Sequence, residues 1–158
     1  MTAAVRAITI RRPWAPCIAS TAPGAKRVEN RGALTHHRGT LLIHEGTKVE
    51  ADAYADPRVV SLLDPGQDDH TVAGAGAVIA VATLADAHHA AAGGCCEPWG
   101  EIWYHGPTRT VRAVHLVLAD VRPLPRPVPC WGALGLWTPS PDVLAEVEAQ
   151  YTEIEVAQ

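Results

Sequence analysis

The segment between Ile8 and His44 carries most of the information about the fold of this chain. It reads ITIRRPWAPCIAS over residues 8–20, GAKRVENR over 24–31 and HRGTLLIH over 37–44. Alternating β-branched residues near its start predict a strand, Pro13 suits the first turn of a short helix, and the Pro-Gly pair at 23–24 ends that helix. The predicted elements are a strand over Val5–Ile10, a helix over Pro13–Ala22, an extended stretch over Lys26–Arg31 and a strand over Gly39–His44.

The remainder of the chain predicts short strands separated by loops. After His44 we predict a helical stretch over Thr47–Leu63 that is broken at Pro57, followed by a loop over Asp64–His70. The elements that come next are a strand over Ala75–Thr83, a loop over Leu84–Pro98, and strands over Glu101–His105 and Val111–Val121. Alternate prolines from Pro123 to Pro129 predict an extended segment without a hydrogen-bonded ladder. Ser140 is a candidate N-cap for an amphipathic helix over Pro141–Tyr151.

This pattern of elements predicts a mainly β or α+β fold. No helix of regular length separates the strands, which argues against a doubly wound parallel sheet. About five or six strands with short helices favour a small closed or nearly closed β-barrel decorated by helices. The length of 158 residues suits one domain over residues 1–158, and five Trp with no Phe predict a core of small aliphatic residues and a few indoles.

Neither a membrane span nor an export signal is indicated. The N-terminal residues carry three arginines without an apolar run, and the longest apolar stretch is interrupted by glycines. We expect a cytoplasmic protein that does not associate with membranes. The four cysteines form no C-x-x-C pair. His88, His89, Cys95 and Cys96 lie close in sequence, but ADAHHAAAGGCCEP is typical of a Gly/Ala loop, so we expect free thiols, no metal and no cofactor.

Charge is distributed unevenly along the chain. Residues 1–43 contain seven Arg and Lys side chains but a single acid, Glu29, which leaves a charge of +6 within a protein whose net charge is −4. This asymmetry favours a site for an anionic ligand in the N-terminal third, with a scattered, solvated surface as the alternative. Extended non-specific coating of DNA is not expected, because the calculated pI is near 6.

The stretch GAKRVENR places an amine, a carboxylate and a guanidinium close together. In an extended chain Glu29 and Arg31 share one face, whereas Lys26 joins them only if it lies in the turn after Gly24. One pocket could then hold all three groups, with Arg31 contacting a phosphate or orienting Glu29. The alternative is a Glu29–Arg31 pair that only fastens the strand to the barrel.

Aromatic side chains and a histidine could complete such a pocket. Trp14 and Trp137 are candidate stacking faces for bases, although a chain without Phe also needs Trp to fill its core. His44 ends an apolar strand and could point into the same cleft or serve as a structural histidine. The remaining indoles, Trp99, Trp103 and Trp131, are assigned to the core or to the barrel rim.

Four ordered elements of the chain resemble the ASCH family of the PUA-like superfamily. Gly24, Lys26, Glu29 and Arg31 match its G-x-K-x-x-E-x-R motif. Arg12, Pro13 and Trp14 match an upstream I-x-x-P-W element, Arg38, Gly39, Ile43 and His44 match a downstream R-G-x-x-x-I-H element, and PVPCWGALGLW over Pro127–Trp137 is similar to the closing segment. The resemblance implies a PUA-like barrel that binds single-stranded nucleic acid, foremost RNA, or a modified nucleoside. The implied binding residues are Arg12, Trp14, Gly24, Lys26, Glu29, Arg31, Arg38, His44 and Trp137.

A hydrolytic role is the alternative that the resemblance leaves open. Some relatives deacylate N4-acetylcytidine through a threonine nucleophile within G-x-K-x-x-T, and ribonuclease activity has been attributed to others. The threonine position is Glu29 in this chain. If the chain is an enzyme, Lys26 and Glu29 would form its acid–base pair, with Glu29 as a base toward water. A scaffold role without a small-molecule ligand is the third hypothesis.

Overall fold

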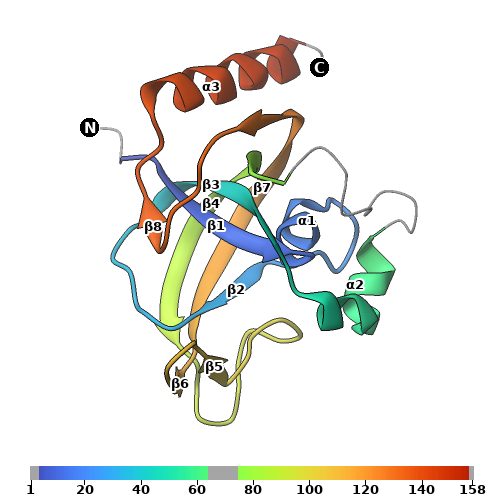
Figure 1. The fold of residues 1–158 in the computed structure, drawn as a ribbon, viewed down its shortest axis with the longest axis vertical. Coiled ribbons are helices and arrows are strands. Elements are labelled where there is room, and N and C mark those ends of the chain that lie inside the picture. The colour runs from blue at the N-terminus through green and yellow to red at the C-terminus, as the bar shows by residue number, and fades with distance from the viewer. Residues whose placement is uncertain (1–3, 64–74, 157–158) are drawn as a thin grey trace.

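The computed structural model describes residues 4–63 and 75–156, with side chains to residue 152 (Figure 1). A curled six-stranded sheet in the order β2-β7-β4-β3-β1-β8 dominates it, and β5 and β6 form a separate hairpin. The strands are β1 (Arg6–Arg12), β2 (Val28–Arg31), β3 (Gly39–Val49), β4 (Ala77–His89), β5 (Trp103–His105), β6 (Thr110–Arg112), β7 (Val114–Pro129) and β8 (Leu136–Trp137). The helices are α1 (Trp14–Ala19), the 3-10 turn η1 (Ala51–Ala55), α2 (Pro57–Leu62) and α3 (Pro141–Val156). The predicted mainly β, barrel-like fold is confirmed.

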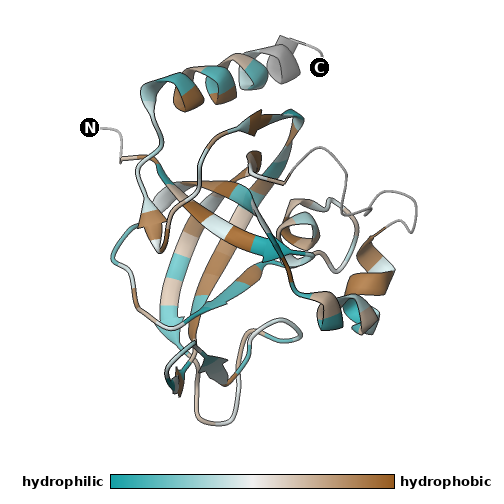
Figure 2. Ribbon diagram, in the orientation of Figure 1, coloured by the Kyte–Doolittle hydropathy of each residue, from teal (hydrophilic) through white to brown (hydrophobic). Residues whose placement is uncertain are grey.

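The sheet is antiparallel except between β1 and β3, and its two faces bury two apolar clusters. Side chains alternate along β3, so that Leu41 and Ile43 enter the cluster beneath α1 while Leu42 enters the cluster beneath α3. Figure 2 shows the hydrophobic residues of α3 gathered on the side that faces the sheet. Val143 and Val147 of α3 belong to that second cluster.

Several predicted boundaries are wrong. Residues 84–89, predicted as a loop, are the end of β4, because pairing with β7 continues to His89. The proline-rich segment is also part of a ladder, in which Pro123 pairs with Ala80 and Pro129 with Ala77. Proline removes an N–H donor but keeps its carbonyl, so it can still accept hydrogen bonds from a neighbouring strand.

Two further corrections concern the ends of helices and strands. The stretch predicted as a broken helix over Thr47–Leu63 begins as β3, which runs to Val49, and continues as η1 and α2. The predicted strand over Val111–Val121 is divided at Ala113 into β6 and β7. The predicted loop over Asp64–His70 lies outside the described residues. The C-terminal helix is confirmed, and the Ser140 hydroxyl accepts a hydrogen bond from the Val143 N–H at 3.3 Å.

No helix in the described part of the chain is long and apolar enough to cross a bilayer.

Candidate functional site

The structure brings Lys26, Glu29 and Arg31 together at the start of β2. Gly24 has a φ of +82°, a left-handed conformation that favours glycine, and it turns the chain before the strand begins. The Lys26 N–H then donates to the carbonyl of Cys17 at 3.0 Å, which places Lys26 ahead of β2 rather than within it. This is the geometry that the sequence analysis required for the three side chains to converge.

The Lys26 amine is almost fully buried, at 3% exposure. Its Nζ donates to Oε2 of Glu29 at 3.0 Å and to the carbonyl of Val28. The rings of Trp14 and Trp99 lie edge to face, and the centroid of each is 5.9 Å from Nζ. A buried ammonium needs a counter-charge and hydrogen-bond acceptors, and this cage provides both together with two aromatic faces.

Arg31 connects this buried pair to the surface. Its Nε lies 3.2 Å from Oε1 of Glu29, at ion-pair distance, and its Nη2 donates to the carbonyl of Thr9 at 2.8 Å. The side chain remains about 25% exposed. Because Nη1 makes no hydrogen bond to the described residues, the outer part of the guanidinium has donors available to a ligand.

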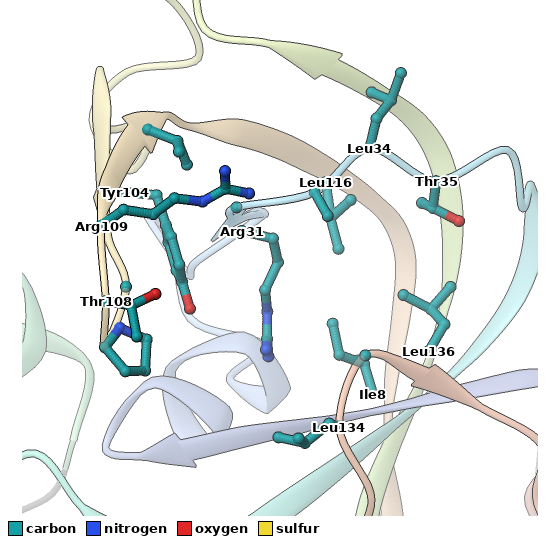
Figure 3. Close-up of a pocket in the computed structure, with 16 residues that line it drawn as sticks. Ile8, Arg31, Leu34, Thr35, Tyr104, Thr108, Arg109, Leu116, Leu134 and Leu136 are labelled. Carbon is teal, nitrogen blue, oxygen red and sulfur yellow. The ribbon is translucent and has the colours of Figure 1, made fainter.

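A half-open pocket of about 500 Å³ adjoins Arg31. Figure 3 shows Tyr104, Thr108 and Arg109 on one side of it and Leu34, Thr35 and Leu136 on the other, with Arg31 between them. None of the described residues that line it is acidic; the others are Ile8, Gly32, Ala33, Gly106, Pro107, Val111, Leu116, Leu134 and Gly135. The pocket therefore combines two guanidinium groups, hydroxyls, one aromatic ring and apolar walls.

Lys26 and Glu29 do not line this pocket, and the remaining predicted residues fall into other groups. Arg12 is buried and pairs with Glu45 at 2.7 Å. Trp14 donates through Nε1 to Glu50 at 2.9 Å. Arg38 is exposed and pairs with Asp86 at 3.3 Å, outside the pocket lining.

His44 and Trp137 form a separate contact. The His44 ring packs edge to face on Trp137, and its Nε2 lies 2.9 Å from the carbonyl of Cys130. Trp137 donates through Nε1 to Oγ1 of Thr9 at 3.1 Å. Thr9 thus links this group to Arg31, since its carbonyl accepts from Arg31 and its hydroxyl from Trp137.

Sequence reasoning missed several residues of the site. Trp99, assigned to the core or rim, is buried against Lys26, and its Nε1 donates to the carbonyl of Gly24 at 3.2 Å. Tyr104 and Arg109 come from the β5–β6 hairpin, and no local motif marks them. Trp131, assigned to the core or to the barrel rim, does not lie in the core: it is 95% exposed, on the segment that leads into β8.

A second group of polar side chains lies at the far end of β4. His88, Cys95, Cys96 and His115 place one ligand-type atom each within 4.8 Å of one another. Hydrogen bonding to the Asp86 carboxylate raises the pKa of His88. The N–H of Ala91 and the nearby His88 lower the pKa of the Cys95 thiol. The segment predicted as a Gly/Ala loop therefore brings Cys95 and Cys96 next to His88 and His115.

Comparisons with known proteins bear on the fold. No family model matches the chain, and no curated protein matches it. Among solved structures, the chain is similar to the crystal structure of a point mutant of ZmASCH from Zymomonas mobilis, with a TM-score of 0.52 and 13% sequence identity over 92% of this chain and 96% of that chain. The expected architecture is confirmed at this level: the chain has the fold of an ASCH-domain protein.

Proposed function

We propose that this chain binds single-stranded RNA or a modified nucleoside in the pocket beside Arg31. One observation carries the proposal: Arg31 is anchored from behind by Glu29 and Thr9 and presents its outer edge to a pocket whose described lining contains no acid. An arginine fixed in this way loses little side-chain entropy when it binds a phosphate. The backbone of a nucleic acid supplies such phosphates in series.

The other lining residues suit a nucleotide as well. A volume of about 500 Å³ is in the range of small-ligand pockets, and Tyr104 offers a ring on which a base could stack. Arg109 is exposed and has no acidic partner among the described residues, so it provides a second positive charge at the rim. Hydroxyls of Thr35 and Thr108 can hydrogen-bond to a sugar or to the edge of a base.

Exposed aromatic side chains could extend the binding surface beyond one nucleotide. Trp131 and Leu134 are 95% and 98% exposed on the segment that continues into the pocket wall at Leu136. Trp103, on the β5–β6 hairpin, is 51% exposed, and the Arg112 guanidinium lies over its ring at 4.6 Å. Tyr104 in the pocket lining and the exposed Trp131 favour a single strand over a duplex, because only unpaired bases offer their faces for stacking.

Hydrolysis of an acylated nucleoside or of RNA is the second candidate. The buried Lys26–Glu29 pair favours it, because an amine 3.0 Å from a carboxylate can exchange a proton. Neither side chain lines the pocket, so a substrate held there would meet Arg31 first. Binding is therefore the better-supported function.

Titration of a fluorescently labelled single-stranded RNA, followed by anisotropy at several salt concentrations, tests the proposal. We expect Arg109→Ala to weaken binding about 5- to 10-fold and to reduce the salt slope by about 0.7, as expected for one lost phosphate contact. Tyr104→Ala should weaken binding at least about 5-fold through lost stacking. Arg122→Ala is the control, because it removes the same single positive charge from a residue that contacts Tyr151 of α3 and lies outside the pocket.

Three outcomes decide between the functions. Unchanged affinity in Arg109→Ala and Tyr104→Ala would exclude the pocket, as would equal losses in Arg122→Ala. If RNA does not bind, the same variants are tested by calorimetry with cytidine and N4-acetylcytidine. Chromatographic detection of cytidine after incubation with N4-acetylcytidine would establish hydrolysis, provided that Glu29→Gln abolishes it.

A further inference from the structure

Two histidines and two cysteines meet where β4 ends and β7 begins. His88 and His115 are register partners on these neighbouring strands, so both imidazoles stand on the same face of the sheet. Their ring centroids are 5.4 Å apart. Cys95 and Cys96 come from the connection that follows β4 and approach the imidazoles from outside the sheet.

Three of the six distances between the four ligand-type atoms match those around one small metal ion, and all six are within 4.8 Å. Sγ of Cys95 lies 3.4 Å from Nδ1 of His115 and 3.7 Å from Nε2 of His88, and Sγ of Cys96 lies 3.4 Å from the same Nε2. Zinc binds sulfur at about 2.3 Å and imidazole nitrogen at about 2.0–2.1 Å, so the edges of its ligand tetrahedron measure about 3.3–3.8 Å. We propose that His88, Cys95, Cys96 and His115 form a zinc-binding site.

The outer ring nitrogens support this assignment independently. Nδ1 of His88 lies 2.7 Å from Oδ2 of Asp86, and Nε2 of His115 lies 2.8 Å from the carbonyl of Glu101. Both partners are acceptors, so in the neutral imidazoles, the form that binds a metal, these outer nitrogens carry the protons and the nitrogens that face the sulfurs keep their lone pairs. Carboxylate and carbonyl partners of this kind orient histidine ligands in known zinc sites.

The backbone of the connection turns both adjacent sulfurs toward the histidines. Neighbouring residues of an extended chain point in opposite directions, but Cys96 has a φ of +60° and so departs from that geometry. Gly100 packs against the turn so tightly that a Cβ there would lie 2.2 Å from the Cys95 carbonyl and 2.8 Å from the His115 ring. The N–H of Ala91 also lies 3.4 Å from Sγ of Cys95, a contact that favours a thiolate.

Four protein ligands leave no open position, which is typical of structural zinc rather than catalytic zinc. The ion would fix the connection that carries Trp99, the residue that packs on Lys26. Asn30 of β2 holds the same connection from the other end through its bonds to the Trp99 carbonyl and the Glu101 N–H, both at 2.9 Å. This inference does not depend on the proposed binding function.

Metal analysis of the purified 158-residue chain tests the site. We expect inductively coupled plasma mass spectrometry to find one zinc per chain. After the zinc is removed by a chelator, one equivalent of Co²⁺ should bind and give the absorption bands of a tetrahedral thiolate complex. Cys95→Ser and His115→Gln should lose this stoichiometric metal, whereas Asp86→Asn should keep the site but weaken it about 10- to 100-fold. Cys130→Ser and His89→Gln are matched controls outside the cluster and should bind like the unmodified chain.

Several results would overturn the proposal. The first is that the chain takes up neither Zn²⁺ nor Co²⁺ although its circular dichroism spectrum shows that it is folded. The second is a Co²⁺ spectrum without thiolate bands, and the third is equal metal content in Cys95→Ser and Cys130→Ser. A Cys95–Cys96 disulfide that persists in the reduced, zinc-supplemented protein would also contradict it. Because the Co²⁺ titration uses the unmodified chain, a folding defect in a variant does not weaken the test.

Discussion

Replacing Lys26 by Met should destabilise the fold much more than the same replacement at Lys48, the other lysine of the chain. The substitution keeps the length of the side chain and removes the charge from a residue that is 3% exposed. Glu29, itself 9% exposed, then loses its shorter ion-pair contact and keeps only Arg31 at 3.2 Å. Breaking a buried pair costs about 3–5 kcal/mol, and because Arg31 still compensates part of the charge we expect the lower end, about 3 kcal/mol.

Urea unfolding followed by circular dichroism measures this cost. With a denaturant slope of about 1–3 kcal/mol/M, a loss of about 3 kcal/mol lowers the midpoint by about 1–3 M. Lys48, the only other lysine, is exposed, so Lys48→Met should change stability by less than about 0.5 kcal/mol. The double variant Lys26→Met/Glu29→Gln should recover at least about 1 kcal/mol relative to Lys26→Met. A Lys26→Met cost below about 1 kcal/mol, or no coupling with Glu29, would refute the buried triad.

Three other substitutions test separate parts of the structure. Gly132→Ala should cost about 1–3 kcal/mol in urea unfolding, because its Cβ would lie 2.8 Å from the buried His44 ring, whereas Gly93→Ala meets nothing within 4 Å and should be tolerated. Ser140→Ala should cost about 1 kcal/mol through the lost cap of α3, with retained stability contradicting the cap. The Arg58 guanidinium lowers the pKa of Asp56, so the ionised carboxylate stabilises the fold at neutral pH by up to about 1 kcal/mol. This contribution is lost as the pH falls below about 4 and passes through the lowered pKa of the folded state. The difference in stability between the unmodified chain and Asp56→Asn should therefore shrink on acidification, and a difference independent of pH would contradict this.

The sequence predicted the barrel-like fold and named the turn after Gly24 as the condition for Lys26 to join Glu29 and Arg31; the structure meets this condition, but only Arg31 of the three lines the pocket. A strand, a turn at Gly24 and an extended stretch are each coded by neighbouring residues, and Lys26, Glu29 and Arg31 fall within one such unit. The ends of β3 and β4 were underestimated because their terminal residues are polar or small and gain strand structure from pairing across the sheet.

Contacts that depend on register could not be predicted from the sequence. His115 joins His88 only because β4 and β7 pair at that offset, and shifting the register by one residue would turn either side chain to the opposite face. His89, which lies next to His88 in sequence and was an equally good candidate by position, is outside the cluster. Trp99 reaches Lys26 for a similar reason, since Asn30 of β2 holds its loop in place.

The curled sheet is closed by side chains where backbone pairing ends. Strand β2 hydrogen-bonds along its length only to β7, and the Arg31 bond to Thr9 spans the remaining distance to β1. Amide hydrogen exchange should reveal the difference: the N–H groups of β2 exchange through local opening, while those in the centre of β3 and β4 exchange only when the whole domain unfolds. The Arg31 pocket lies at this seam, and Ile8 and Leu116 belong both to its lining and to the apolar cluster beneath α1, so opening the pocket would disturb that cluster.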